Sequence, residues 1–228
     1  MANIVRLLST LGLKGAVLGL AAQFEATRGI RIDADFAPTL ALLPRLRGRE
    51  AADLAILTRE GLDDLAREGL VVAESRTDLA RSYVGLAVKA GAPHPDIATA
   101  AALRTALLAA RSVAYSRLGA SGILFAQLLE RLGIAGEVNV KATIIPSGFT
   151  AERLLSGEAD FAVQQISELK QVPGIDVVGP IPLDLQTPAV FSAGRLTSAE
   201  RPAEADQLLR FLASAEVAPA LRANGLEP

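Results

Sequence analysis

Cysteine and tryptophan are absent from the 228-residue chain, and histidine occurs once, as His94. Without cysteine the protein can form no disulfide, thiolate nucleophile or zinc-thiolate site. A single histidine excludes a histidine-rich metal site, and any Ser-His-acid triad would depend on it alone. Because His94 lies between two prolines in a loop, we expect it to be a surface residue, and we expect neither a metal nor a cofactor.

The chain also lacks a concentration of charge and is poor in aromatic residues. Its 23 basic and 25 acidic residues are spread along the sequence, so we expect no nucleic-acid groove, which needs a basic stripe. Two tyrosines and seven phenylalanines disfavour a sugar site built on stacked rings. The segment Gly119-Ala-Ser-Gly122 has neither the Walker lysine nor the dinucleotide-binding spacing, so nucleotide binding is not expected.

Long hydrophobic runs are missing too, although half of the residues are hydrophobic. No run is long enough to span a bilayer, so the protein is not expected to be membrane-spanning. The apolar N-terminus resembles a signal peptide, but Lys14 interrupts it and no basic leader precedes it. As written, the chain is expected to be cytoplasmic, or periplasmic if it is a mature or truncated form.

One short segment occurs twice. Residues 48–58 and 157–165 both run from glycine through Glu-Ala and aspartate into an apolar stretch that ends in polar residues, Thr58 in one copy and Gln164-Gln165 in the other. A helix-like run precedes each copy, at 39–46 and 150–155. We interpret each copy as a buried strand with a polar end, in two similar lobes.

Strand and helix patterns alternate along the chain, which favours an α/β fold. The predicted strands are 4–8, 30–36, 54–57, 84–88, 112–115, 138–145, 161–164, 177–180 and 189–193. The strongest predicted helices are 99–110, 121–132, 150–156 and 202–213, and a helix at 13–27 follows the first strand. We predict that 1–82 with 188–228 form lobe 1 and that 83–187 form lobe 2, so that the chain crosses a hinge twice.

Hydroxyls and amides follow several of these strands, where α/β folds usually bind ligands. Singly, each is an ordinary helix cap. Together they suit an oxyanion or small carboxylate, because a buried anion needs hydrogen-bond donors to its oxygens. The predicted ligand-binding residues are Ser9, Thr10, Thr39, Thr58, Ser116, Ser121, Ser147, Gln164 and Gln165.

Charged residues also lie near these positions in the sequence. Lys14 and Arg117 are cations that a carboxylate could contact, although solvent exposure also explains them. Asp53 and Asp160 precede the strand at matching places in the two copies. That position is away from the expected site, so we interpret both as structural.

The order and spacing of these segments resemble the type II periplasmic solute-binding fold, and in particular the molybdate-binding-protein-like family. The resemblance lies in Leu8-Ser-Thr, in residues 36–40 and 52–58, in Ala114-Tyr-Ser with residues 119–123, and in residues 162–167. It implies a two-lobed Venus flytrap, each lobe a mixed sheet flanked by helices, with hydroxyls and backbone amides holding an oxyanion. Carried over, the contacts would come from Ser9, Thr10, Thr39, Ser121, Ser147 and Gln165.

The chain departs from that family where molybdate binders have a serine cluster after the second strand and a tyrosine after the late strand. Here those places hold Ala37-Pro38-Thr39 and Gln164-Gln165, which leaves room for an organic acid. The broad family also includes proteins that resemble aconitate isomerase. An allylic proton shift of that kind needs an acid and a base beside the substrate, for which the candidates are Lys14, Tyr115 and Arg117.

The main hypothesis is therefore a monomeric, non-catalytic binding protein that captures a small anion between two lobes and serves ABC-type uptake through a permease. One alternative is an isomerase of a small unsaturated carboxylic acid. Another is a cytoplasmic anion sensor that reports to a partner.

Overall fold

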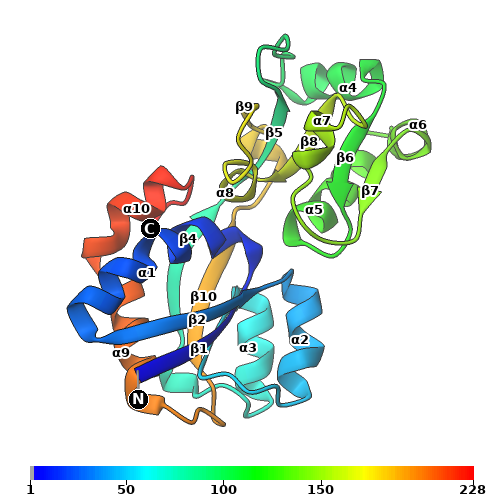
Figure 1. Ribbon diagram of the computed structural model, residues 1–228. Helices are drawn as coiled ribbons and strands as arrows, with labels where there is room; N and C mark the ends of the chain where they lie inside the picture. The colour runs from blue at the N-terminus through cyan, green and yellow to red at the C-terminus, as the bar shows by residue number, and fades with distance from the viewer. Residues whose placement is uncertain (1–2) are drawn as a thin grey trace. The chain divides into compact units, whose positions relative to one another are not determined.

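The computed structural model describes residues 3–228, in which the chain forms two compact α/β units (Figure 1). The first unit extends to Ser82 and also includes Ala189–Pro228, whereas the second unit is Tyr83–Pro188. No helix in this described range is both long and apolar enough to cross a membrane.

The first unit is built on a five-stranded mixed sheet of order β2-β1-β3-β10-β4. Its strands are β1 (Asn3–Ser9), β2 (Ile30–Phe36), β3 (Leu54–Thr58), β4 (Thr77–Ser82) and β10 (Ala189–Arg195). β1 runs parallel to β2 and β3, and β10 runs antiparallel to β3 and β4. β3 is central and buried on both faces, which explains its unbroken apolar sequence.

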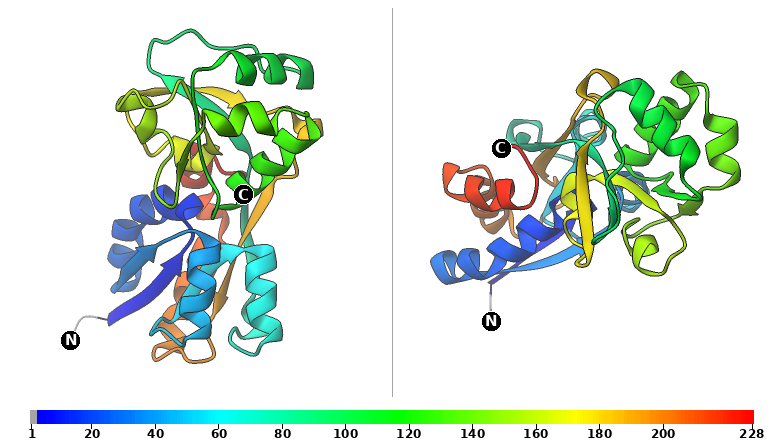
Figure 2. Two further views of the ribbon diagram at one scale, coloured as in Figure 1. Left: turned by 90° about the vertical axis from the view of Figure 1, so that its right-hand side faces the viewer. Right: turned by 90° about the horizontal axis from the view of Figure 1, so that it is seen from above.

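Helices cover both faces of this sheet. They are α1 (Lys14–Arg28), α2 (Thr39–Arg47), α3 (Arg59–Arg67), α9 (Pro202–Leu212) and α10 (Ala218–Ala223), with 3-10 turns at Leu11–Leu13, Ala73–Ser75 and Ala215–Val217. α2 and α3 lie side by side against one face (Figure 2). Because side chains alternate along a strand, Leu54 and Ile56 face α1 and α9, whereas Ala55 and Leu57 face α2 and α3.

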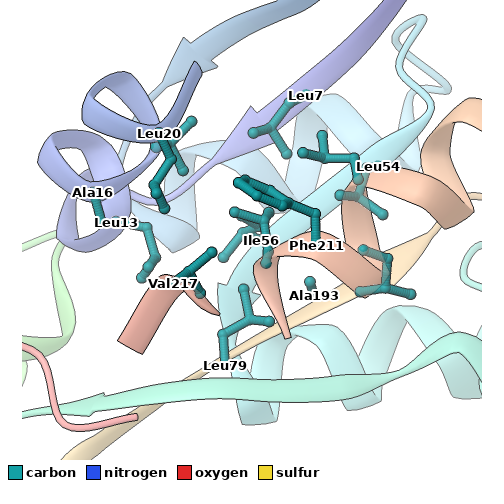
Figure 3. Packing of buried hydrophobic residues seen from close by; sticks show 14 of the residues in the cluster. Leu7, Leu13, Ala16, Leu20, Leu54, Ile56, Leu79, Ala193, Phe211 and Val217 are labelled. Carbon is teal, nitrogen blue, oxygen red and sulfur yellow. The ribbon is translucent and has the colours of Figure 1, made fainter. Parts of the chain in front are cut away.

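The core between the sheet and α9 contains Phe211, whose ring lies among Leu7, Leu54 and Ile56 (Figure 3). Its centroid is 5.2 Å from that of Phe24 on α1. This packing joins α9 to the first strands of the chain, because the hydrophobic face of α9 is buried there.

The second unit repeats the arrangement with a sheet of order β7-β6-β8-β5-β9. Its strands are β5 (Val84–Lys89), β6 (Val113–Ser116), β7 (Thr143–Ile145), β8 (Phe161–Gln165) and β9 (Ile175–Pro180). β6 is parallel to β7 and β8, and β5 is antiparallel to β8 and β9. The helices are α4 (Ala100–Ala109), α5 (Ala120–Arg131), α6 (Ala135–Val140), α7 (Glu152–Leu155) and α8 (Ile166–Leu169), with a 3-10 turn at Leu183–Leu185.

The repeated sequence segment corresponds to this repeated topology. Its two apolar stretches are β3 and β8, each the central strand of its sheet, each with one parallel and one antiparallel neighbour. The prediction of two buried strands in an α/β fold of two mixed sheets is thereby confirmed.

The predicted strand at 138–145 is wrong in its first half. Residues up to Val140 belong to α6, and only Thr143–Ile145 form a strand. Ile134 and Val138 are buried one helical turn apart, whereas Val140 is 91% exposed. The spacing of the buried positions is thus helical, although the β-branched composition had suggested a strand.

Strand β4 was not predicted. It lies at the edge of the first sheet, where β10 is its neighbouring strand and Arg81 forms an isolated bridge with Glu227, and it carries Asp78 and Arg81 on exposed positions. Edge strands tolerate such charges because one side of the strand faces solvent, so their hydrophobic pattern is weak.

Candidate functional site

In the first unit, the structure brings together Thr39 and Thr58, two of the predicted binding residues. Thr58 ends β3 and caps α3, where its Oγ1 accepts a hydrogen bond from the Gly61 N–H at 3.4 Å. Thr39 begins α2, and its Oγ1 accepts from the Thr58 N–H at 3.2 Å. A hydroxyl that accepts in this way keeps its own hydrogen to donate. Both side chains are therefore suited to hold an anion.

Ser9 and Thr10 follow β1 in the same unit and differ from each other. The buried Ser9 hydroxyl donates to the Thr10 carbonyl at 3.1 Å, so its hydrogen is already used. The Thr10 N–H donates to the Ile56 carbonyl, but its side chain makes no capping hydrogen bond at the following 3-10 turn. Of the two hydroxyls, that of Thr10 is the better placed to donate to a ligand.

In the second unit, Ser116 and Ser121 lie on either side of the loop that starts α5. The Ser116 Oγ accepts from the Leu118 N–H at 3.3 Å, which leaves its hydrogen available. Ser121 is buried in the first turn of α5 and does not cap that helix. A Cβ on Gly119 would lie 3.8 Å from the Ser121 Oγ and 4.0 Å from the Ser116 Oγ, so both hydroxyls converge on this glycine.

Gly122 allows this convergence. A Cβ at this position would lie 1.3 Å from the Ser116 carbonyl oxygen, a separation that no side chain permits. The start of α5 therefore packs directly on the end of β6, which places the first turn of the helix beside the two serines.

Gln164 is directed into the unit. Its Oε1 accepts from the Thr150 N–H at 2.8 Å and from the Thr150 Oγ1 at 3.0 Å, and its Nε2 donates to the Gly148 carbonyl at 3.0 Å. Because these bonds use the amide, Gln164 supports the 148–150 loop. Ser147, in the same loop, is exposed and forms no part of this network.

Gln165 ends β8, and its backbone N–H donates to the carboxylate of Glu168, which also accepts a hydrogen bond from Gln164. Burial raises the pKa of Glu168 to about 7, although these two hydrogen bonds favour its charged form. The sequence analysis missed Glu168. The available signal was its spacing: a glutamate three residues after a helix cap is typical of a capping box, but glutamine is an unusual cap.

The three candidates for acid and base catalysis are placed differently. Tyr115 is buried in the core, where it packs against Phe125, and its hydroxyl donates to Asn139 Oδ1 at 2.6 Å. This placement removes it from the candidates. Arg117 is exposed in the loop before α5, where its guanidinium is suited to pair with a carboxylate. Lys14 is half-buried at the start of α1, with its Nζ 5.9 Å from the centre of the Phe36 ring.

The two repeated aspartates stabilise the fold. Asp53 is buried and accepts from the Arg6 and Arg201 N–H groups, both at 2.9 Å. Asp160 accepts from the Arg111 N–H at 2.8 Å and from its guanidinium. Burial opposes ionisation of Asp160, but Arg111 outweighs it, so the pKa of Asp160 lies below its ordinary value.

No group of three or more His, Cys, Asp or Glu side chains within residues 3–228 is arranged to hold a metal ion. His94 is exposed, with its Nε2 3.7 Å from an Asp176 oxygen. A cavity of about 560 Å³ in the second unit is lined by Lys89, Arg111 and Asp160 together with apolar residues. It lies at the start of β6 and β8, the opposite end of these strands from Ser116 and Gln165.

Each unit thus has hydroxyls that keep a hydrogen to donate, and each of these sets has a cation nearby in sequence. Lys14 follows Ser9 and Thr10, and Arg117 follows Ser116. Neutral donors suffice for a bare oxyanion, whereas a ligand with several carboxylates is better matched by donors together with cations.

Comparison with known proteins agrees with this fold. The chain is 37% identical over 227 residues to aconitate isomerase from Pseudomonas sp, and the alignment covers 97% of this chain and 86% of that protein. The periplasmic molybdate-binding protein of Azotobacter vinelandii superimposes with a TM-score of 0.84 at 17% identity, over 98% of this chain and 99% of the other. Peb3 from Campylobacter jejuni superimposes with a TM-score of 0.72 at 15% identity, over 98% of this chain and 99% of the other.

Residues 5–227 match the family described as bacterial extracellular solute-binding protein. The expected resemblance to solute-binding proteins of type II fold is confirmed by this match and by the structural similarity. The chain belongs to the bacterial extracellular solute-binding protein family.

Proposed function

We propose that the protein is an isomerase of a small unsaturated polycarboxylic acid, aconitate or a close analogue. The observation that carries the proposal is 37% identity to aconitate isomerase across 97% of the chain. This reverses the order of the hypotheses drawn from sequence, in which the binding protein came first and the isomerase second.

The reaction would be an allylic proton shift. A base removes a proton from the methylene carbon of CH2–C=CH, the electron pair of that C–H bond forms the new double bond, and the old double bond takes up a proton at its far carbon. In aconitate both end carbons carry carboxylates, so the shifted product has the same skeleton and can have the other double-bond geometry. The intermediate carries additional negative charge, which spreads onto the carboxylates.

Hydrogen-bond donors that face the carboxylates would stabilise this charge. The donors we propose are the hydroxyls of Thr10, Thr39 and Thr58 in the first unit and of Ser116 and Ser121 in the second. Gln165 would contribute its side chain. Ser9 and Gln164 would support their neighbours, because their polar groups are used internally, and no role is proposed for the exposed Ser147.

Lys14 is the remaining candidate for direct proton transfer among the three chosen from sequence, and Arg117 would pair with a carboxylate. The proposal is tested by proton NMR of cis- and trans-aconitate in heavy water with the purified protein. We expect interconversion together with deuterium incorporation at the methylene and vinyl positions. An unchanged spectrum for both isomers would refute the isomerase.

A matched pair of variants tests the role of Lys14. Lys14→Met should reduce the rate of isomerisation by at least about a hundredfold, since general acid-base groups contribute that much. Lys89→Met is the control, because Lys89 lies at the end of β5 beside the cavity at the other end of the sheet. Equal rates in the two variants would exclude Lys14 from catalysis.

The second candidate function is a binding protein for a small anion that serves uptake through an ABC permease. The fold similarity to the Azotobacter vinelandii molybdate-binding protein favours it. A thermal-shift series with molybdate, tungstate, sulfate, citrate and both aconitates distinguishes the two, because a ligand that binds the native state raises its melting temperature. Stabilisation by an anion without isomerisation of aconitate would favour the binding protein.

A further inference from the structure

A buried carboxylate follows the end of β8, and the first unit has none at the equivalent place. Thr58 and Gln165 end the two central strands and cap the helices that follow. Three residues later come Gly61 and Glu168, respectively. In the first unit a neutral hydroxyl accepts the Gly61 N–H, whereas in the second the Glu168 carboxylate accepts the N–H of the cap itself.

Among the described residues, no charged group contributes to the pKa shift of Glu168. Its helix, α8, packs against β8, β5 and β9. β8 carries no titratable residue, Lys89 is exposed at the far end of β5, and Asp176 on β9 bonds the Gly91 N–H. Lys170 follows α8 and is exposed, and Tyr83, before β5, is only partly buried. Burial is the main cause of the raised pKa of Glu168, and it outweighs the two hydrogen bonds, which lower that pKa.

The carboxylate also organises the residues around it. Gln164 donates to Glu168 and to the Gly148 carbonyl while it accepts from Thr150, so the buried amide joins β8 to the 148–150 loop. A change in the charge of Glu168 alters the acceptor for Gln164 and Gln165 together, because both donate to the same carboxylate.

We infer that Glu168 is a proton-linked positioning residue, whose neutral form is the one that accommodates a negatively charged ligand beside Gln165. The inference rests on the proposed function, which places a carboxylate of the substrate at the end of β8. When Glu168 is charged, its carboxylate accepts the Gln165 N–H, which is then not available to the ligand. The charged carboxylate also repels an anionic ligand, because the protein interior screens charges poorly. Binding therefore takes up a fraction of a proton near pH 7 and about one proton at alkaline pH.

The first test needs no ligand. The backbone amide of Gln165 and the side-chain amide of Gln164 should shift in NMR spectra through one titration near neutral pH in the wild type. Neither should titrate in Glu168→Gln, which is permanently neutral and similar in shape. Amide shifts that stay constant from about pH 5 to 9 in the wild type overturn the inference, whether or not the variant folds. So does a titration that persists in Glu168→Gln.

The second test is calorimetric titration with trans-aconitate in two buffers of different ionisation enthalpy. The wild type should take up about one proton at alkaline pH, and its affinity should fall about tenfold per pH unit there. Glu168→Gln should bind without proton uptake at every pH. Glu158→Gln removes an exposed carboxylate in the same unit and should retain the wild-type behaviour.

The outcomes separate the inference from the function on which it rests. Binding of trans-aconitate by the wild type without proton uptake overturns the inference and leaves the function standing. If no binding is detected at any pH, the function fails, and the amide titration alone decides the role of Glu168.

Discussion

The two units have equivalent strand orders, yet different polar groups follow the central strand in each. In the first unit, neutral hydroxyls of Thr39 and Thr58 accept backbone N–H groups and keep their hydrogens for a ligand. In the second, a network of Gln164, Thr150 and Glu168 is satisfied internally and contains a buried carboxyl group. Duplicated topology therefore does not imply duplicated electrostatics. In the part of the chain that the structure describes, the second unit has a titratable side chain, Glu168, at the position where the first unit has Gly61.

The largest expected change in the free energy of unfolding concerns the packing of α5 on β6. Glycine is required there by a close backbone contact, whereas elsewhere in a helix glycine only lowers the helix propensity. Gly122→Ala places a Cβ 1.3 Å from the Ser116 carbonyl oxygen, so α5 must move. We expect a loss of about 4 kcal/mol or failure of the second unit to fold, as in severe overpacking. Gly19→Ala, in open space on α1, should instead stabilise by about 0.5 kcal/mol. Urea unfolding measures both, and similar stabilities would show that α5 does not pack on β6 in this way.

The second unit has a buried carboxyl group, Glu168, where the first unit has Gly61. This difference predicts that the free energy of unfolding depends on pH through the second unit. The folded-state pKa of Glu168 is raised from 4.5 to about 7, so its contribution is fully present below about pH 4.5 and is lost as pH rises to about 7. Relative to Glu168→Gln, the wild type should lose about 3 kcal/mol across this range, at 1.36 kcal/mol per pKa unit. The measurement is urea unfolding of both proteins at a series of pH values, and parallel curves would contradict it.

The repeated aspartates test whether matching positions have matching importance. Asp53→Ala removes the acceptor of two backbone N–H groups at a buried site, so we expect a loss of about 3 kcal/mol. Asp160→Ala removes a partner of the largely exposed Arg111, so about 1 kcal/mol is expected. Thermal unfolding of the two variants measures the difference. Equal losses would mean that burial does not distinguish the two copies.

The smallest expected effect is on ligand affinity, and it distinguishes a helix-capping threonine in the proposed site from one elsewhere. Thr58 and Thr99 both cap helices, by accepting from Gly61 and Ala102 N–H groups respectively. Each Thr→Ala change should cost about 1 kcal/mol of stability. Thr58→Ala should in addition weaken trans-aconitate binding by about tenfold, as loss of a hydrogen bond to a charge does. Calorimetry on both variants tests this, and equal ligand affinities would place Thr58 outside the site.

Much of the architecture could be predicted from local pattern. The apolar runs at 54–57 and 161–163 are continuous because both faces of β3 and β8 are covered, so they indicated buried strands directly. The pattern was misleading at Val138, where β-branched residues belong to a helix that buries every fourth position. It was weak at β4, where an edge strand carries charges.

The candidate site was less predictable, because it depends on where polar groups point. Ser9 and Thr10 are adjacent and similar in sequence, yet one hydroxyl donates to a carbonyl and the other does not cap its turn. Tyr115 lies in the core, although it was one of the three candidates for acid or base catalysis. No local pattern distinguishes these cases, since the partners are distant or on other elements.

The sequence alone determined the alternation of strands and helices, the duplication, and the polar residues at the strand ends, because these follow from periodicity and composition over short windows. Only the tertiary structure decided which of those residues are used internally. Gln164 reaches Thr150 fourteen positions earlier, and Glu168 lies in a helix packed against β5 and β9. Exclusion of water by these distant segments raises the pKa of Glu168, and a short window of sequence does not contain that information.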